Sequence, residues 1–158
     1  MSKVPSKLIK VFVYGTLKYG EPNHFWLNKS ENGFARFLSA GKTIEKFPLV
    51  VGTRYNIPFL LDEKGAGHRI HGEVYEVDDV MLASLDVLED YPNYYDRELQ
   101  KVKTENGEPE CWLYLIRSFP EQLLKKTFLE SYSNMTDQPY CERSARDKSI
   151  KAMEDMTY

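Results

Sequence analysis

The sequence has few cysteines and no long apolar run, and each absence removes a class of protein. The 158 residues include two cysteines, Cys111 and Cys141. Two cysteines this far apart are too few for a disulfide framework or a zinc knuckle, so we expect both to be free thiols. No apolar stretch approaches the roughly 20 residues that span a bilayer, and residues 1–10 lack the apolar segment of a secretory signal. We therefore expect a cytoplasmic protein with no membrane partner.

An excess of charge of one sign is also missing. The chain carries 21 Lys and Arg against 24 Asp and Glu, which gives a formal net charge of −3 at pH 7, and the basic residues are scattered. Such a chain offers no basic surface to a phosphate backbone, so we expect no nucleic-acid partner. The sequence identifies no protein partner.

The chain does contain enough apolar material for one core. Apolar residues make up 42% of the sequence and aromatic residues 13%. A chain of this length can close one sizeable core. From about Ser131 the composition becomes polar and charged and its periodicity disappears. We therefore expect one domain over residues 1–130, followed over residues 131–158 by a polar C-terminal tail that lies outside the catalytic core.

Short strand-like segments dominate the first 130 residues. Alternating apolar, aromatic and β-branched residues predict strands over residues 8–14, 33–45, 49–55, 59–62, 68–77, 95–103 and 110–116. The Asn106-Gly107 pair predicts a hairpin between the last two of these strands. Many short strands leave edges that closure of the sheet removes. The predicted fold is therefore α+β: a small, mostly antiparallel β-barrel with flanking short helices.

One helix is clearly indicated, and it carries a carboxylate on its apolar side. The helix is predicted to begin with Asp78 as its cap and to end at Tyr91, before Pro92. Turning by about 100° per residue, Glu89 falls inside an apolar arc of about 120°, which is formed by Met81, Leu82, Leu85 and Leu88. A carboxylate in an apolar face has a raised pKa, and this tunes a general base toward neutral pH. The opposing interpretation is that Glu89, at the helix end, turns to solvent.

The loop after the first predicted strand is the second candidate feature. Tyr14-Gly15-Thr16-Leu17 follows that strand and leads into a predicted short helix over residues 22–28. Such a loop can present backbone N–H groups to an anion or a carbonyl oxygen. Its glycine spacing resembles that of a phosphate-binding loop, but Glu21-Pro22 stands where Lys and Ser or Thr are needed. We therefore exclude nucleotide binding at this loop.

Other candidate residues favour structural interpretations. His71 and Glu73 share one side of a predicted strand but have no third ligand, so we expect no metal site. Cys111 lies within a predicted strand rather than in a nucleophile elbow. Arg97 and Arg117 could bind a substrate carboxylate, but pairs with surface acids are the better interpretation.

Four segments together resemble the γ-glutamylcyclotransferase-like family in order and spacing, over about residues 11–119. They are Tyr14-Gly15-Thr16-Leu17, Gly72-Glu73-Val74-Tyr75, Leu85-Asp86-Val87-Leu88-Glu89 and Tyr95-Asp96-Arg97. The resemblance implies a small β-barrel and a γ-glutamyl substrate, whose α-amino group attacks its own γ-carbonyl to give 5-oxoproline and a free amine.

The resemblance also implies roles for individual residues. Glu89 would act as the general acid and base, and the loop Tyr14, Gly15, Thr16 and Leu17 would bind the γ-glutamyl group. Tyr95 would line the cavity, although an ordinary buried aromatic role suits Tyr14 and Tyr95 equally well. The reaction needs no cofactor and no metal. The competing hypothesis is a non-catalytic module that keeps the pocket for ligand sensing or binds another protein.

Overall fold

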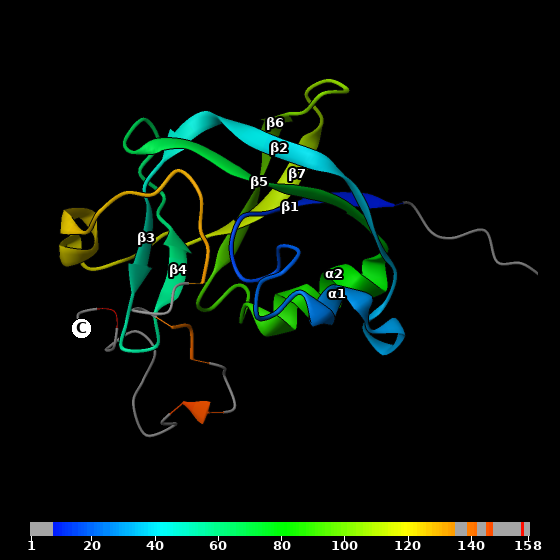
Figure 1. Cartoon of the computed structure of the whole chain (residues 1–158), viewed down its shortest axis with the longest axis horizontal. Coiled ribbons are helices and arrows are strands. Elements are labelled where there is room, and N and C mark those ends of the chain that lie inside the picture. The colour runs from blue at the N-terminus through cyan, green and yellow to red at the C-terminus, as the bar shows by residue number, and fades with distance from the viewer. Residues whose placement is uncertain (1–7, 135–138, 142–144, 147–155, 157–158) are drawn as a thin grey trace, which may run out of the picture.

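Five strands close into a barrel in the computed structural model, and two further strands form a small sheet beside it (Figure 1). The structure describes residues 8–134, 139–141, 145, 146 and 156. The barrel strands are β1 (Ile9–Val13), β2 (Ala35–Phe47), β5 (His68–Val77), β6 (Asp96–Lys103) and β7 (Glu110–Leu115). The second sheet pairs β3 (Leu49–Gly52) with β4 (Ile57–Leu60). The predicted fold class is confirmed, and the bounds of β5 are those that its alternation predicts.

The barrel is antiparallel except where it closes. Around the barrel the order is β1-β5-β2-β6-β7, and β1 returns to β7 as a parallel neighbour, with Val11 opposite Trp112. The long strand β2 pairs with both β5 and β6, and its register against β5 shifts at two places. Such shifts bend a strand, and this bend allows one strand to serve two neighbours in a small closed sheet.

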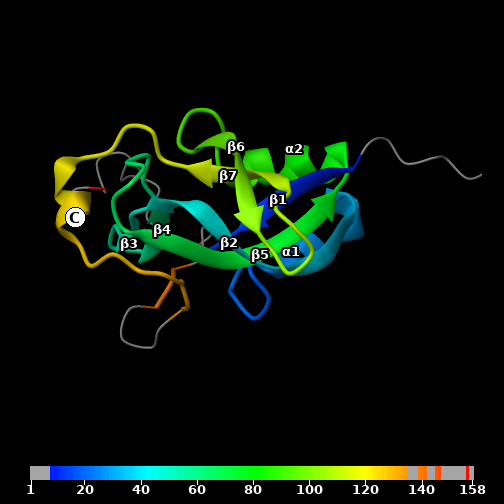
Figure 2. The same ribbon diagram turned by 90° about the horizontal axis from the view of Figure 1, so that it is seen from above.

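Four short helical segments flank the sheets: α1 (Phe25–Asn28), α2 (Asp79–Leu88) and the 3₁₀ turns η1 (Ser30–Asn32) and η2 (Glu121–Lys125). Figures 1 and 2 place the β3–β4 sheet at one end of the molecule and α2 toward the other. The predicted helix over residues 22–28 is reduced to its last turn.

The helix α2 begins as predicted and ends earlier. The carboxylate of Asp78 caps it by accepting a hydrogen bond of 2.8 Å from the Met81 N–H. Met81 and Leu85 are fully buried. The helix stops at Leu88, so Glu89 occupies the C-cap, and the chain then turns through Asp90 at a φ of 52°. The turn at Asp90 ends the helix before the predicted Tyr91.

The described residues after Ser131 are anchored to the fold. Tyr132 and Met156 are 2% and 1% exposed and belong to the two core clusters. The ammonium group of Lys18 donates a hydrogen bond to the carbonyl oxygen of Tyr132. Described parts of the predicted polar tail therefore pack into the fold, because single apolar side chains enter the core without any periodic pattern. The division of the chain near residue 130 stays a prediction.

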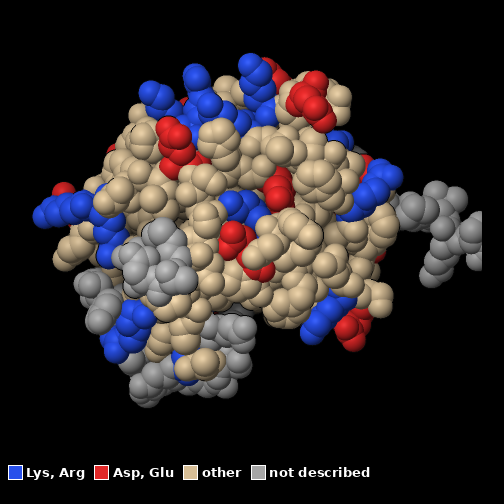
Figure 3. Space-filling model, in the orientation of Figure 1, with Lys and Arg blue, Asp and Glu red and all other residues tan. Residues whose placement is uncertain are grey.

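The mixed surface charge and the two free cysteines are those expected from the composition. On the face shown in Figure 3, uncharged residues cover most of the area, and acidic and basic side chains are interspersed. Cys111 is a buried free thiol and Cys141 a half-buried one. Within the described ranges, none of the helices has both the length and the apolar character needed to cross a membrane.

Arg117 is the centre of a surface ion-pair network, as expected from the prediction that it pairs with surface acids. Its guanidinium contacts Asp96 at 2.7 Å, Asp62 at 3.1 Å, and Glu98. The hydrogen bond from Arg117 lowers the pKa of Asp96. Burial alone would raise the pKa of Asp62, but hydrogen bonds from Lys64 and Arg117 outweigh it and lower that pKa as well. These carboxylates are thus harder to protonate in the folded protein than in the unfolded chain.

This network predicts a loss of stability in acid. A carboxylate with a depressed folded-state pKa stabilises the fold above its unfolded pKa of about 4, and the contribution disappears as the pH falls through the lower folded value. The free energy of unfolding should therefore fall between about pH 5 and pH 2, and Arg117→Gln should make that fall shallower. Urea titrations at several pH values measure it. Arg69→Gln is the control, because Arg69 donates to the Ile44 carbonyl oxygen. Equal slopes for Arg117→Gln and wild type would contradict the prediction.

Candidate active site

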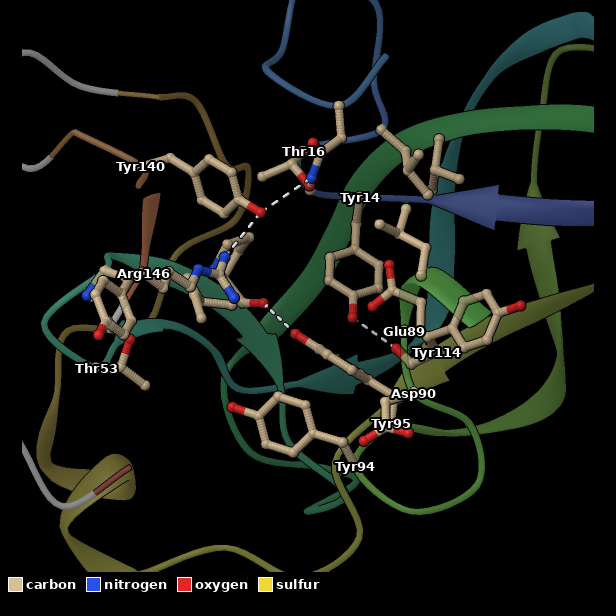
Figure 4. A pocket seen from close by; sticks show the side chains of 18 of the residues that line it. Tyr14, Thr16, Thr53, Glu89, Asp90, Tyr94, Tyr95, Tyr114, Tyr140 and Arg146 are labelled. Atoms are coloured by element: carbon tan, nitrogen blue, oxygen red, sulfur yellow. Dashed lines mark hydrogen bonds between the residues drawn. The ribbon is translucent and has the colours of Figure 1, made fainter. Parts of the chain in front are cut away.

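A cavity of about 370 Å³ lies between the loop after β1, the end of α2 and the β3–β4 sheet. Figure 4 shows it from close by. Segments far apart in the chain supply its walls, among them the Tyr14–Leu17 loop after β1, the turn between β3 and β4, and the C-terminal residues Tyr140 and Arg146. The lining residues are Phe12, Val13, Tyr14, Gly15, Thr16, Leu17, Asn23, Thr53, Tyr55, Ile57, Pro58, Leu88, Glu89, Asp90, Tyr94, Tyr95, Tyr114, Tyr140 and Arg146.

The structure brings all the predicted site residues to this one cavity. Glu89 follows the last residue of α2, and its backbone N–H donates to the Leu85 carbonyl oxygen at 2.9 Å, which holds the residue at the helix end. Its half-buried side chain lies in the cavity among the tyrosine rings of Tyr14 and Tyr114 (Figure 4). The interpretation in which Glu89 turns away to bulk solvent is therefore wrong.

The tyrosine hydroxyls around Glu89 are held in their neutral form. The Tyr14 hydroxyl donates to the Tyr114 carbonyl oxygen at 2.6 Å, and the Tyr95 hydroxyl donates to the Pro58 carbonyl oxygen at 2.9 Å. Burial is the main cause that raises the pKa of Tyr14 and of Tyr95, and the negative charge of Glu89 raises both further. The phenols of Tyr14 and Tyr95 beside the carboxylate are thus uncharged, and each donates its hydrogen bond to a backbone carbonyl oxygen.

The loop from Tyr14 to Leu17 lines the cavity. Among the described residues, the N–H groups of Gly15, Thr16 and Leu17 form no hydrogen bond. Asn23 braces the loop, because its N–H donates to the Thr16 carbonyl oxygen at 2.8 Å and its amide donates to the Thr16 hydroxyl at 3.0 Å. A Cβ on Gly15 would lie 3.0 Å from Pro58 Cγ, so a glycine allows the loop to pack closely against β4.

A charged network supports the wall behind Tyr114. The Tyr114 hydroxyl donates to Asp86 at 2.7 Å, and Asp86 also accepts hydrogen bonds of 2.9 and 3.2 Å from Arg97. The Arg97 guanidinium lies 4.5 Å from the centre of the Tyr91 ring and 4.4 Å from that of Trp112. Arg97 therefore pairs with an acid, as expected, and does not line the cavity.

Among the lining residues that the sequence did not predict are Tyr140 and Arg146. Both lie in the segment predicted to stand outside the site, and that prediction is wrong for them. The Tyr140 hydroxyl accepts hydrogen bonds from the Asn23 amide at 3.0 Å and from Arg146 at 2.9 Å. Neither residue could have been found from a local pattern, because each stands singly in a polar stretch.

The residues that the structure describes contain no cluster of three or more His, Cys, Asp or Glu side chains that could hold a metal ion. His71 is exposed on β5, while Glu73 accepts hydrogen bonds from the Tyr75 hydroxyl at 3.0 Å and the Tyr19 N–H at 2.8 Å. Among the described residues, the cavity is lined by two carboxylates, the half-buried Glu89 and the exposed Asp90, together with neutral tyrosine hydroxyls and the Tyr14–Leu17 loop. The arrangement defines a class of site suited to acid–base chemistry on a small polar ligand.

Comparison with known proteins identifies the family. Residues 11–134 match the family described as gamma-glutamyl cyclotransferase, AIG2-like. The chain belongs to this family, and its activity is of the γ-glutamylcyclotransferase type. The resemblance on which the sequence analysis relied is thereby confirmed.

Relatives and a solved structure agree. The chain is 61% identical over 150 residues to the Drosophila melanogaster protein named "Putative gamma-glutamylcyclotransferase CG2811", with 94% of each chain covered. It is 42% identical over 130 residues to the gamma-glutamylaminecyclotransferase of Bos taurus, with 81% of this chain and 77% of the relative covered. The crystal structure of an AIG2-like protein from Mus musculus superposes with a TM-score of 0.85 at 37% identity, covering 89% of this chain and all of the mouse chain.

Proposed function

We propose that the protein converts γ-glutamyl amines, such as ε-(γ-glutamyl)lysine, into 5-oxoproline and a free amine, with Glu89 as general acid and base. The observation that carries the proposal is the position of Glu89 in the cavity beside the Tyr14–Leu17 loop. Placing a carboxylate on the wall of a mostly apolar cavity costs hydration free energy. A role in proton transfer explains why a carboxylate stands there. The name of the bovine relative supports an amine as the leaving group.

The proposed reaction needs only proton transfers from the protein. Glu89 takes a proton from the α-ammonium of the substrate, and the freed nitrogen lone pair attacks the γ-carbonyl carbon. The carbonyl oxygen becomes an oxyanion. When the bond to the leaving nitrogen breaks, the oxyanion reforms the carbonyl and Glu89 returns its proton to the departing amine. The attacking nitrogen still carries one proton more than the lactam N–H of 5-oxoproline, and Glu89 passes this proton to the released amine, which leaves as an ammonium ion. Nucleophile and leaving group belong to one molecule, so the site accelerates the reaction mainly by holding the folded conformer.

In this scheme the backbone N–H groups of the Tyr14–Leu17 loop supply the partial positive charge that complements the negative groups of the substrate. The N–H groups of Gly15, Thr16 and Leu17 bind the α-carboxylate of the γ-glutamyl group or the developing oxyanion. Tyr14 and Tyr95 line the cavity as neutral phenols. Because the pKa of each phenol is raised, neither adds a negative charge that would oppose the oxyanion.

A substrate panel tests the proposal. Purified protein is incubated with ε-(γ-glutamyl)lysine, with glutathione and with a γ-glutamyl-α-amino acid, and release of 5-oxoproline is followed. We expect the fastest release from ε-(γ-glutamyl)lysine. Faster release from glutathione would show that the substrate class is wrong. Binding of 5-oxoproline without turnover of any compound would favour a non-catalytic ligand-sensing module.

A further inference from the structure

The cavity has a cationic wall that the proposed reaction does not use. Figure 4 shows Arg146 and Tyr140 on one side of the cavity and Glu89 with Tyr14 on the other. Arg146 and Tyr140 lie beyond residues 11–134, the part of the chain that the family model matches. A role for Arg146 would therefore lie outside the part of the chain that the family model covers.

The surroundings of Arg146 orient its guanidinium. The guanidinium carbon lies over the Tyr55 ring at 5.4 Å and over the Tyr140 ring at 5.3 Å. One nitrogen donates to the Cys141 carbonyl oxygen at 3.0 Å and another to the Tyr140 hydroxyl at 2.9 Å. Through Tyr140 the group is connected to Asn23, which also braces the Tyr14–Leu17 loop. The contacts that the described residues make with the guanidinium come from aromatic faces and neutral acceptors, which orient the group and leave its charge unpaired.

Arg146 differs in this respect from other arginines of the chain. Arg36, Arg97 and Arg117 each form an ion pair with at least one carboxylate. For Arg146 the described residues supply no ion pair, and its two hydrogen bonds use two of the five N–H donors of a guanidinium. An oriented, positively charged donor group on a cavity wall is complementary to a carboxylate, which it binds through two parallel hydrogen bonds.

We propose that Arg146 binds a carboxylate carried by the leaving amine, so that among γ-glutamyl amines the preferred substrates are those whose amine carries a free carboxylate, as in ε-(γ-glutamyl)lysine. This inference rests on the proposed function. In this proposal the scissile amide lies beside Glu89 and the γ-glutamyl group in the Tyr14–Leu17 loop, and the leaving group extends toward the wall opposite Glu89, where Arg146 lies. Free ε-(γ-glutamyl)lysine carries such a carboxylate, whereas a lysine inside a peptide chain does not.

The test compares two substrates that differ at the recognised group alone. One is ε-(γ-glutamyl)lysine, and the other is the same compound with the lysyl carboxylate converted to a carboxamide. Wild type should favour the acid by about 10–100-fold in kcat/KM, the worth of a charge-assisted pair. Arg146→Gln should lower kcat/KM for the acid by about the same factor, mainly through KM, and leave the carboxamide within about twofold. For the acid, kcat/KM of Arg146→Lys should lie between the values of wild type and of Arg146→Gln.

Controls separate recognition from structure. Arg36→Gln, which alters an exposed arginine paired with Glu76, should preserve the preference for the acid. Equal losses on both substrates in Arg146→Gln, or weaker binding of 5-oxoproline, would overturn the proposal, because the residue would then act on the fold or on the γ-glutamyl end. Unchanged kinetics on both substrates would also overturn it.

A binding measurement keeps this inference distinct from the proposed function. If wild type turns over neither compound, the proposed function is wrong, but calorimetry still measures the affinity of both compounds for wild type and for Arg146→Gln. A preference for the acid that is lost in the variant supports carboxylate recognition by Arg146. Equal affinities of wild type for the two compounds overturn it.

Discussion

Replacing Glu89 by Gln should lower the turnover of ε-(γ-glutamyl)lysine by roughly 10²–10⁴-fold, the usual worth of a positioned general base. The amide keeps the shape and hydrogen-bonding capacity of the carboxyl group but cannot take a proton from the α-ammonium. The measurement is kcat from the release of 5-oxoproline, with the affinity for 5-oxoproline determined on the same preparation.

The structure indicates that this variant folds. The contact that places Glu89 at the end of α2 is made by its backbone N–H with the Leu85 carbonyl oxygen, and the substitution leaves that contact unchanged. The charge of Glu89 also raises the pKa of Tyr14 and of Tyr95, beyond the main effect of burial. The hydroxyls of Tyr14 and Tyr95 donate to backbone carbonyl oxygens and not to Glu89, so these contacts of the cavity wall should remain in the variant.

The choice of control follows from the structure. On the sequence alone, Asp86→Asn is the matched change, because Asp86 lies on the same helix outside the apolar arc. The structure shows that Asp86 accepts hydrogen bonds from Tyr114 and Arg97, so its replacement disturbs the cavity wall. Glu108→Gln, in the exposed loop between β6 and β7, is the better control and should keep normal turnover. Near-normal turnover of Glu89→Gln would show that the catalytic assignment is wrong.

Local patterns were sufficient where one segment determines its own structure. The alternation over residues 68–77 predicted β5 because one side of that strand is buried at every second position, as at Ile70, Gly72 and Val74. Asp78 predicted the start of α2 because a capping carboxylate acts within one turn. The spacing of Glu89 from Leu85 predicted a carboxylate on the covered side of the helix, and the cavity lies there.

Patterns failed where the structure depends on contacts between distant segments. The parallel pairing of β1 with β7 closes the barrel, and neither strand carries a local signal for its partner. Tyr140 and Arg146 reach the cavity singly from a polar segment, and the contacts that retain them are with Tyr55 and Asn23, more than 80 residues earlier. The identity of the site was therefore predictable from the sequence, but its full lining was not.

The largest effect on stability is expected from Gly72→Ala, where the barrel and the site meet. Gly72 on β5 lies opposite Gly41 on β2. A Cβ at Gly72 would lie 2.4 Å from the Val13 carbonyl oxygen and 2.6 Å from Phe12 Cζ. The oxygen belongs to the backbone at the end of β1 and cannot rotate away, so the strand itself must shift. We expect a loss of about 3 kcal/mol in the free energy of unfolding, and a fall in Tm of roughly 6–12 °C.

Gly41→Ala is the matched control, because it adds the same methyl group to the glycine directly opposite. Its Cβ would meet Val102 Cγ1 at 2.6 Å, which is the end of a side chain that can move, so the loss should be about 1 kcal/mol. Val13 immediately precedes Tyr14, so the strain at Gly72 should also displace the first residue of the Tyr14–Leu17 loop, which we propose binds the γ-glutamyl group. Gly72→Ala should therefore lose turnover even where it remains folded, whereas Gly41→Ala should not. Equal thermal shifts for the two variants would show that the Val13 carbonyl oxygen can move freely and that the contact does not position the loop.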